Sequence, residues 1–223
     1  MFDTIFTTIG STTKRFTVKN PYNKPVHIQS IQLAGGQTSD YRLNIDGNLT
    51  NKLTDVELDA NDSLFVFVEV TIDPNNDNSP LVVKDSVLVR INGNLQDIKL
   101  VAWGQDVHLI NGELLKTQTW TADKPYLIYN SALVDTQNTL RIEPGARIHS
   151  HRDSRFYVAG TLISGGTKQS PVIFSGDRLE EDYSDIPGQW TGIYFLPGSH
   201  DNVLNHTHVK NAMIGIQADT LGN

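Results

Sequence analysis

Apolar and polar residues alternate over short segments in the first half of the chain. In the segment 14–19, Phe16 and Val18 share one side of an extended chain, and charged or hydroxyl-bearing side chains occupy the other. This period of two predicts a half-buried strand. The segment 64–72 is almost continuously apolar, which predicts a central strand covered on both faces. The sequence Asn-Gly-Asn at 92–94 predicts a tight hairpin between two further strands.

Strands of this kind follow one another at the spacing of a β-sandwich. About seven or eight of them lie in roughly the first 100 residues, separated by turns rich in Asn, Asp, Gly and Pro. We therefore predict an antiparallel sandwich over residues 1–108. The chain has no cysteine, so the disulfide of antibody-type domains is excluded. The segment 105–123 has little periodicity, and we interpret it as the crossing to a second domain.

A short repeat marks the second half of the chain. The sequence Trp-Thr-Gly-Ile-Tyr-Phe at 190–195 returns in looser form as Met-Ile-Gly-Ile-Gln-Ala at 213–218, and the two Gly-Ile pairs are 23 residues apart (215 − 192). A repeat of about 20–30 residues is typical of a solenoid. From Tyr126 onward, short apolar segments end at Gly or Pro-Gly. We therefore predict the stacked coils of a parallel β-helix over residues 109–223.

Composition and charge exclude several classes of function. The net charge is −7, from 18 Lys and Arg against 25 Asp and Glu, and no basic cluster occurs. We expect no nucleic-acid partner, because such a chain has little to offer a phosphate backbone. The absence of cysteine excludes thiolate zinc sites and cysteine nucleophiles. No apolar run approaches the ~20 residues that a membrane helix needs, so we expect no membrane insertion.

An acidic loop precedes the Pro-Gly pair at 187–188. Its five carboxylates belong to Asp177, Glu180, Glu181, Asp182 and Asp185. Calcium binds several oxygen ligands, and such a loop can supply them. The spacing matches no EF-hand, and a solvated excursion from the coil explains the same residues. The loop is therefore a candidate calcium site, and no other cofactor is indicated.

Two His-x-His pairs, at 149–151 and 206–208, are a second candidate for metal binding. Alternate residues of a strand share a face, so each pair could present two imidazoles to one ion. The sequence places no third ligand. Exposed histidines on successive coils explain the pairs equally well.

Aromatic residues of the second half form a candidate ligand-binding strip. Trp190, Tyr194 and Tyr183 are the residues that we expect to stack against a sugar ring. The alternative is that they are ordinary residues at the edge of a core. No sequence of a nucleophile elbow, a P-loop or a zinc protease occurs, so we predict no catalytic residue.

Several motifs resemble known modules. Phe16, Val18, Asn20 and Pro25 fit the F-x-V-x-N-x-x-x-x-P pattern of immunoglobulin-like modules of the MSP/HYDIN kind. The second half contains L-x-I-E-P-G-A-x-I at 140–148, P-V-I-F-S-G-D at 171–177, G-Q-W-x-G-I-Y-F at 188–195 and N-x-x-x-V-K-N-A-x-x-G-I at 205–216. Together they resemble cell-surface proteins of Bacteroidetes, often lipoproteins, in which a right-handed parallel β-helix follows an immunoglobulin-like module.

The resemblance implies a function outside the cell. It implies a non-catalytic binding or scaffold module, lipid-anchored in the parent protein, whose partner is a polysaccharide or a surface protein. The alternative is a fragment of a polysaccharide lyase or glycoside hydrolase whose catalytic coils lie outside this chain. β-Helices of this kind continue for more coils, whereas this sequence stops at Asn223. We therefore expect either a homodimer through the open end of the β-helix or disorder of the final residues.

Overall fold

The computed structural model describes residues 4–7, 9–73 and 81–219. The chain divides into two units, residues 1–106 and residues 107–223, whereas the sequence placed the boundary after residue 108. Strands dominate both units, and the helices among the described residues are two three-residue 3-10 turns, η1 (Gly36–Thr38) and η2 (Glu181–Tyr183). Neither turn is long or apolar enough to cross a membrane. The chain is an all-β protein, as the sequence predicted.

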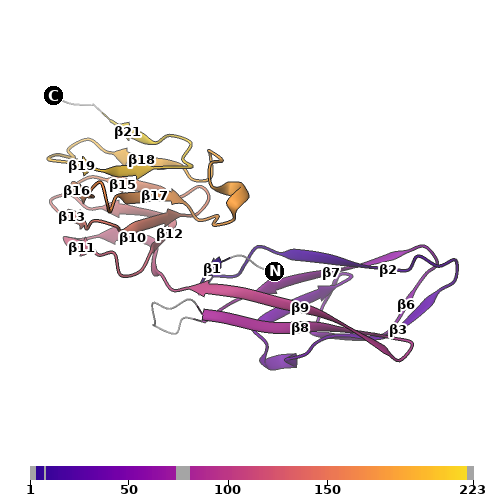
Figure 1. The fold of residues 1–223 in the computed structure, drawn as a ribbon. Coiled ribbons are helices and arrows are strands. Elements are labelled where there is room, and N and C mark those ends of the chain that lie inside the picture. The colour runs from indigo at the N-terminus through magenta and orange to yellow at the C-terminus, as the bar shows by residue number, and fades with distance from the viewer. Residues whose placement is uncertain (1–3, 8, 74–80, 220–223) are drawn as a thin grey trace. The chain divides into compact units, whose positions relative to one another are not determined.

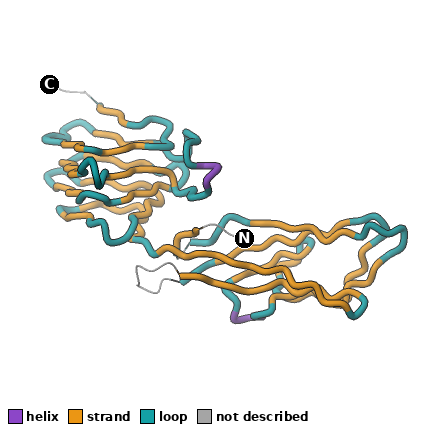
Figure 2. The backbone as a smooth tube through the Cα atoms, viewed as in Figure 1, coloured by secondary structure: helices purple, strands orange, loops and turns teal. Residues whose placement is uncertain are grey.

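Two sheets form the N-terminal unit (Figures 1 and 2). Their strands are β1 (Thr4–Phe6), β2 (Lys14–Lys19), β3 (Val26–Leu33), β4 (Tyr41–Ile45), β5 (Asn48–Leu49), β6 (Lys52–Leu58), β7 (Ser63–Val70), β8 (Leu81–Ile91) and β9 (Asn94–Gln105). The strand orders are β1-β9-β8-β3-β6 and β2-β7-β4-β5. The pair β1 and β9 is parallel, so the five-stranded sheet is mixed, whereas the sequence predicted antiparallel pairing throughout.

One core fills the space between these two sheets. Alternate residues of β4 and β7 meet alternate residues of β3, β8 and β9 there, all of them apolar and buried. The hairpin predicted at 92–94 is confirmed: Ile91 pairs with Asn94, and both Asn92 and Gly93 have positive φ. A two-residue turn with positive φ at both positions matches the twist of the strands that it joins.

Strand β7 differs from its prediction on one point. It is central, with β2 on one side and β4 on the other. Its even-numbered residues from Leu64 to Val70 are buried, but Phe65 is 39 % exposed and Phe67 is only partly buried. The prediction that both faces are covered is therefore wrong. The reason is that β7 lies in an outer layer of the sandwich. A continuous run of apolar residues does not by itself show whether a further layer covers the second face of a strand.

Parallel strands form the second unit. Those strands are β10 (His108–Leu115), β11 (Gln118–Trp120), β12 (Tyr126–Val134), β13 (Thr139–Ile142), β14 (Arg147–Ser150), β15 (Arg155–Val158), β16 (Thr161–Gly165), β17 (Val172–Gly176), β18 (Gly192–Phe195), β19 (Val203–Asn205), β20 (Thr207–Val209) and β21 (Ile216–Ala218). The first half of β12 pairs with β14 and its second half with β15. The orders β11-β13-β16-β19, β14-β17-β20 and β15-β18-β21 give three parallel ladders, stacked as Figure 1 shows.

The parallel stack begins within one residue of the start predicted for the second domain, residue 109. Strand β10 pairs in parallel with β12, and β11 pairs with β13, so the segment 105–123 contains the first layer of the stack. Its interpretation as a crossing between the domains was therefore wrong. At the other end, Ile193 pairs with Ile216, which is the register that the 23-residue repeat demands.

The last layer of strands leaves apolar side chains exposed. Met213, Ile214 and Ile216 are exposed there. The homodimer through this end stays a prediction. The final residues, 220–223, lie outside the described part of the chain.

Aromatic and aliphatic side chains of all three ladders fill the interior of this unit. Phe156 packs edge-on against Trp120 at a centroid distance of 5.9 Å and against Phe174 at 5.5 Å. All three side chains are essentially inaccessible to solvent. Because each layer buries its apolar residues on the next, the layers stabilise one another in sequence.

One carboxylate near the start of the stack, that of Asp123, has a lowered pKa. Asp123 accepts hydrogen bonds from Thr121 and from the His108 ring, whose Nε2 lies 3.0 Å from Oδ2. The hydrogen bond from Thr121, aided by the one from His108, lowers the pKa of Asp123 from 3.8 to about 2. A lowered pKa in the folded state contributes stability above pH 4 or so, and this stability is lost as the pH falls toward about 2.

We expect Asp123→Asn to flatten this part of the stability profile, measured by chemical unfolding at stepwise pH. A variant that keeps the full wild-type slope between pH 4 and pH 2 would contradict the assignment.

Candidate functional site

The exposed face of the sheet β2-β7-β4-β5 brings together side chains from four strands. The register places Phe67 of β7 opposite Arg15 of β2 and Asn44 of β4, and Asn44 opposite Leu49 of β5. Opposite residues of an antiparallel pair point to the same face, so these four side chains form one row across the sheet. Next to Phe67 along β7 on the same face, Glu69 pairs in register with Arg42.

Two aromatic rings follow each other on this face. The centroids of Phe65 and Phe67 are 6.5 Å apart, and the guanidinium carbon of Arg15 lies 5.5 Å from the Phe65 centroid. Large apolar side chains left open to solvent cost free energy unless a partner covers them. Leu49, 87 % exposed, stands on the other side of the row.

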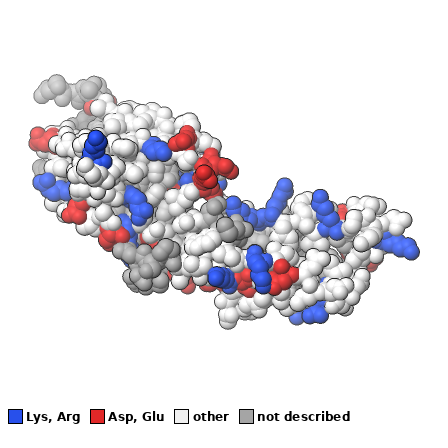
Figure 3. Space-filling view, in the orientation of Figure 1, with Lys and Arg blue, Asp and Glu red and all other residues white. Residues whose placement is uncertain are grey.

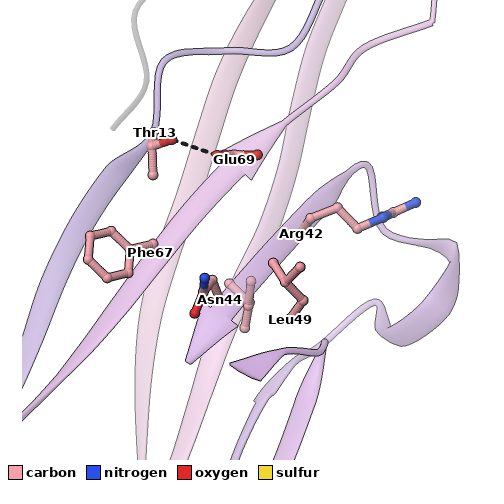
Figure 4. A pocket seen from close by; sticks show the side chains of 7 residues that line it. Thr13, Arg42, Asn44, Leu49, Phe67 and Glu69 are labelled. Atoms are coloured by element: carbon pink, nitrogen blue, oxygen red, sulfur yellow. Dashed lines mark hydrogen bonds between the residues drawn. The ribbon is translucent and has the colours of Figure 1, made fainter. Parts of the chain in front are cut away.

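A hollow of about 280 Å³ lies beside the Phe67 ring (Figure 4). Its lining consists of Thr13, Arg42, Leu43, Asn44, Leu49, Phe67 and Glu69. Figure 4 shows Glu69 and Thr13 at one end, Asn44 between the Phe67 ring and Leu49, and the guanidinium of Arg42 directed away from the ring. An aromatic wall with a few polar groups is the usual composition of a small-molecule site.

The amide of Asn44 is the unusual group of this hollow. Its Oδ1 atom is buried and has no hydrogen-bond partner within the described residues. A buried polar atom without a partner costs about 1–3 kcal/mol, and most such atoms in native proteins are paired. A half-turn of the side-chain amide exchanges its oxygen and nitrogen ends, so the group can offer an acceptor or a donor. Within the described residues, the Oδ1 atom of Asn44 is therefore a buried polar atom in the wall of the hollow that lacks a protein partner.

The remaining polar groups are arranged by the protein itself. The Thr13 hydroxyl donates to Oε1 of Glu69 at 2.6 Å, which orients the carboxylate. The Arg42 guanidinium donates to the carbonyl oxygens of Ser39 and Tyr41 and is held at the margin of the hollow. The carboxylate of Glu69 thus retains lone pairs for hydroxyl donors, and the aliphatic stem of Arg42 lines the wall.

This site was not predicted from the sequence, because the segment 64–72 was predicted to be a strand covered on both faces. The signal that was available is the polar residue Glu69 within that apolar run, which falls on the same side of the strand as Phe65 and Phe67. The partners across the sheet could not be predicted, because they come from strands far apart in the sequence whose register only the folded sheet defines.

The predicted aromatic strip of the second unit is only partly at the surface. Trp190 is 1 % exposed, belongs to the core, and donates from its indole to the carbonyl oxygen of Lys210 at 2.8 Å. Its prediction as a ligand-binding residue is therefore wrong. Tyr183 lies in the acidic loop with the Arg178 guanidinium 3.8 Å from its ring centroid. Tyr194 is partly buried on the outer side of β18.

The predicted calcium loop does not gather its carboxylates. Asp177 contacts His151 at 2.6 Å, Glu180 contacts Arg178 at 2.8 Å, and Asp185 contacts Lys210 at 3.2 Å. Figure 3 shows acidic atoms gathered where the turn η2 lies in Figure 1, but Glu181 and Asp182 are exposed there. Among the residues that the structure describes, no group of three or more His, Asp or Glu side chains is placed to hold a metal ion. Three of the five carboxylates, those of Asp177, Glu180 and Asp185, thus contact basic side chains of the protein itself.

The first histidine pair contacts protein groups. His151 stacks on Tyr129 with ring centroids 4.0 Å apart and contacts Asp177, and His149 contacts the carbonyl oxygen of Gly176 at 3.1 Å. Burial lowers the pKa of His149 and keeps its ring neutral. Burial, with a smaller effect of Asp177, raises the pKa of Tyr129 to about 12. Both histidine rings thus hold parts of the stack in place.

Comparison with known proteins adds little to this geometry. No protein-family model matches the chain, and no curated protein matches it. Among solved structures, a family 123 glycoside hydrolase from Clostridium perfringens, described in a study of glycolipid glycan hydrolysis, matches with a TM-score of 0.35 and 9 % sequence identity. The match covers 54 % of this chain and 26 % of that chain. So low a TM-score supports neither a shared fold nor a shared activity.

Proposed function

We propose that the chain is a non-catalytic glycan-binding module and that the hollow beside Phe67 takes one neutral sugar unit. The unpaired amide of Asn44 in the wall of the hollow carries this proposal. A sugar ring has an apolar face for Phe67 and hydroxyl groups for Asn44 and Glu69. The carboxylate of Glu69 repels acidic sugars, so neutral sugars are the favoured class.

We also propose a finer description of the two units. The N-terminal unit is an immunoglobulin-like sandwich, which the two sheets around one core support. The second unit is a short right-handed parallel β-helix, which the three parallel ladders support. Location on the outer cell surface, with a lipid anchor in the parent protein, stays a prediction from the resemblance.

Binding to an array of neutral and acidic oligosaccharides tests the proposed function. For a neutral glycan that binds, we expect Phe67→Ala to lower the affinity about tenfold or more, because the aromatic wall is lost. Asn44→Leu should also abolish most binding. It should leave the free energy of unfolding unchanged or raise it, because it removes a buried amide oxygen that has no partner within the described residues.

Tyr22→Ala provides the matched control, because Tyr22 is an exposed aromatic of the same unit outside the hollow. This variant should bind like the wild type. An array on which no neutral glycan binds, or on which Phe67→Ala binds as well as the wild type, would overturn the proposal. Release of oligosaccharide from any glycan during incubation would contradict the non-catalytic part.

A further inference from the structure

A column of outward-facing residues crosses the ladder of β15, β18 and β21 and continues through β12 and β10. The register stacks Leu114, Leu133, Tyr157, Tyr194 and Gln217 from one layer to the next. Neighbouring strands of a sheet are about 4.8 Å apart, so the column is a straight strip along the stack. Leu114 and Gln217 are exposed, and the three residues between them are partly buried.

Two tyrosines and one arginine form the centre of this strip. The ring centroids of Tyr157 and Tyr194 are 5.8 Å apart with an interplanar angle of 51°. The exposed Arg155 donates from Nη1 to the Tyr157 hydroxyl at 2.9 Å, and its guanidinium carbon lies 5.8 Å from the Tyr194 centroid. We call Arg155, Tyr157 and Tyr194 the tyrosine strip.

The backbone explains why the guanidinium reaches Tyr194. Arg155 pairs in register with Gly192, which has no side chain to occupy the position next to Tyr194. A guanidinium has five N–H donors, and the hydrogen bond to Tyr157 uses only part of them. Its planar fork matches the geometry of a carboxylate.

Two charged residues, Arg152 and Asp153, precede Arg155 closely in the sequence. Their side chains are 83 % and 86 % exposed and form an ion pair at 3.7 Å, so they largely offset each other. The hydrogen bond and the ring contact of the Arg155 guanidinium are both with tyrosines, and Asp153 adds a smaller electrostatic attraction. The strip therefore combines two aromatic rings with one positive charge.

We infer that the tyrosine strip binds a polysaccharide chain that carries carboxylates, with sugar rings on the two tyrosines and a carboxylate on Arg155. The strip runs along the stack, so it suits an extended chain. This inference does not rest on the hollow beside Phe67, which lies in the other unit and is proposed for a neutral sugar.

Binding of the full chain to polygalacturonate and to alginate, measured by calorimetry and affinity electrophoresis, tests the inference. Fully methyl-esterified polygalacturonate serves as the neutral probe with the same sugar rings. We expect at least one of the two acidic polymers to bind, and the ester to bind about tenfold more weakly than polygalacturonate where that polymer binds. Rising salt should weaken binding of the acidic polymer.

Substitutions distinguish binding at the tyrosine strip from nonspecific electrostatic binding. Arg155→Gln and Tyr194→Ala should each lower the affinity about tenfold. Arg155→Lys, which keeps the charge but loses the planar fork, should also bind less tightly. Arg152→Gln removes an equally exposed arginine of the same unit and should have no effect, and Phe67→Ala should likewise have none.

Failure of both acidic polymers to bind would overturn the inference, as would equal binding of polygalacturonate and its ester. An equal loss of affinity in Arg152→Gln and Arg155→Gln would mean that binding depends only on the net charge of the chain. That result would also overturn the inference. Thermal unfolding of each variant checks its fold, and Arg155→Lys gives a second readout if Arg155→Gln is unstable. Loss of neutral-glycan binding in Phe67→Ala with this binding intact separates the two sites.

Discussion

Gly192→Ala is expected to destabilise the second unit by at least about 3 kcal/mol. Gly192 has φ +137, a conformation that a residue with a side chain rarely adopts, and an added Cβ would lie 1.7 Å from the carbonyl oxygen of Ile214. This oxygen belongs to a backbone segment that is hydrogen-bonded to the layer containing Gly192. The amide of Ile214 donates to the carbonyl oxygen of Thr191 at 3.0 Å, and that of Ile193 donates to Gly215 at 3.2 Å. Neither layer can move without breaking these bonds.

Gly215→Ala is the matched control, because Gly215 is the corresponding glycine of the repeat. No atom lies within 4 Å of its added Cβ. We expect the free energy of unfolding to change by no more than about 0.5 kcal/mol. Denaturant unfolding followed by tryptophan fluorescence measures both variants, and the buried indole of Trp190, two residues from Gly192, contributes to the signal. If Gly192→Ala lowered the free energy of unfolding no more than Gly215→Ala does, the close approach at Gly192 would relax and the prediction would be wrong.

Asn20→Asp is expected to destabilise the N-terminal unit by about 3 kcal/mol or more. Asn20 is 3 % exposed, and its Nδ2 donates to the carbonyl oxygens of Lys24, Leu58 and Asp59 at 2.8, 3.1 and 2.8 Å. Its Oδ1 accepts from the amide of Tyr22 at 3.1 Å. The aspartate has the same shape, but it places an oxygen in contact with three carbonyl oxygens and buries a negative charge.

Two further variants identify the cause of that loss. Asn20→Ala leaves the same backbone groups unpaired without adding a charge, so its cost should be smaller, about 2 kcal/mol. Asn94→Asp makes the same change at an exposed position and should be nearly neutral. Hydrogen exchange measured by mass spectrometry would show whether the loss is confined to residues 4–73 and 81–106. A wild-type stability for Asn20→Asp would contradict the role of the side-chain amide.

The candidate site shows where prediction from sequence ended. Phe65, Phe67 and Glu69 stand on one side of a strand by simple alternation, so their common face could be known in advance. Asn44 reaches the same hollow from β4, and Thr13 reaches it from the residue before β2, through pairings that are set by long-range contacts. The missing partner of Asn44 is a property of its surroundings and leaves no trace in the order of residues.

The sequence by itself determined the all-β class, the Asn-Gly hairpin and the 23-residue register that pairs Ile193 with Ile216. These features follow from local periodicity and turn chemistry, which neighbouring residues encode. Only the tertiary structure decided that one face of β7 stays open, that the segment 105–123 contributes strands to the parallel stack, and that Trp190 is in the core. Each of these features depends on which distant segments of the chain pack against a given strand. The same apolar residues can lie in an interior or on a binding face.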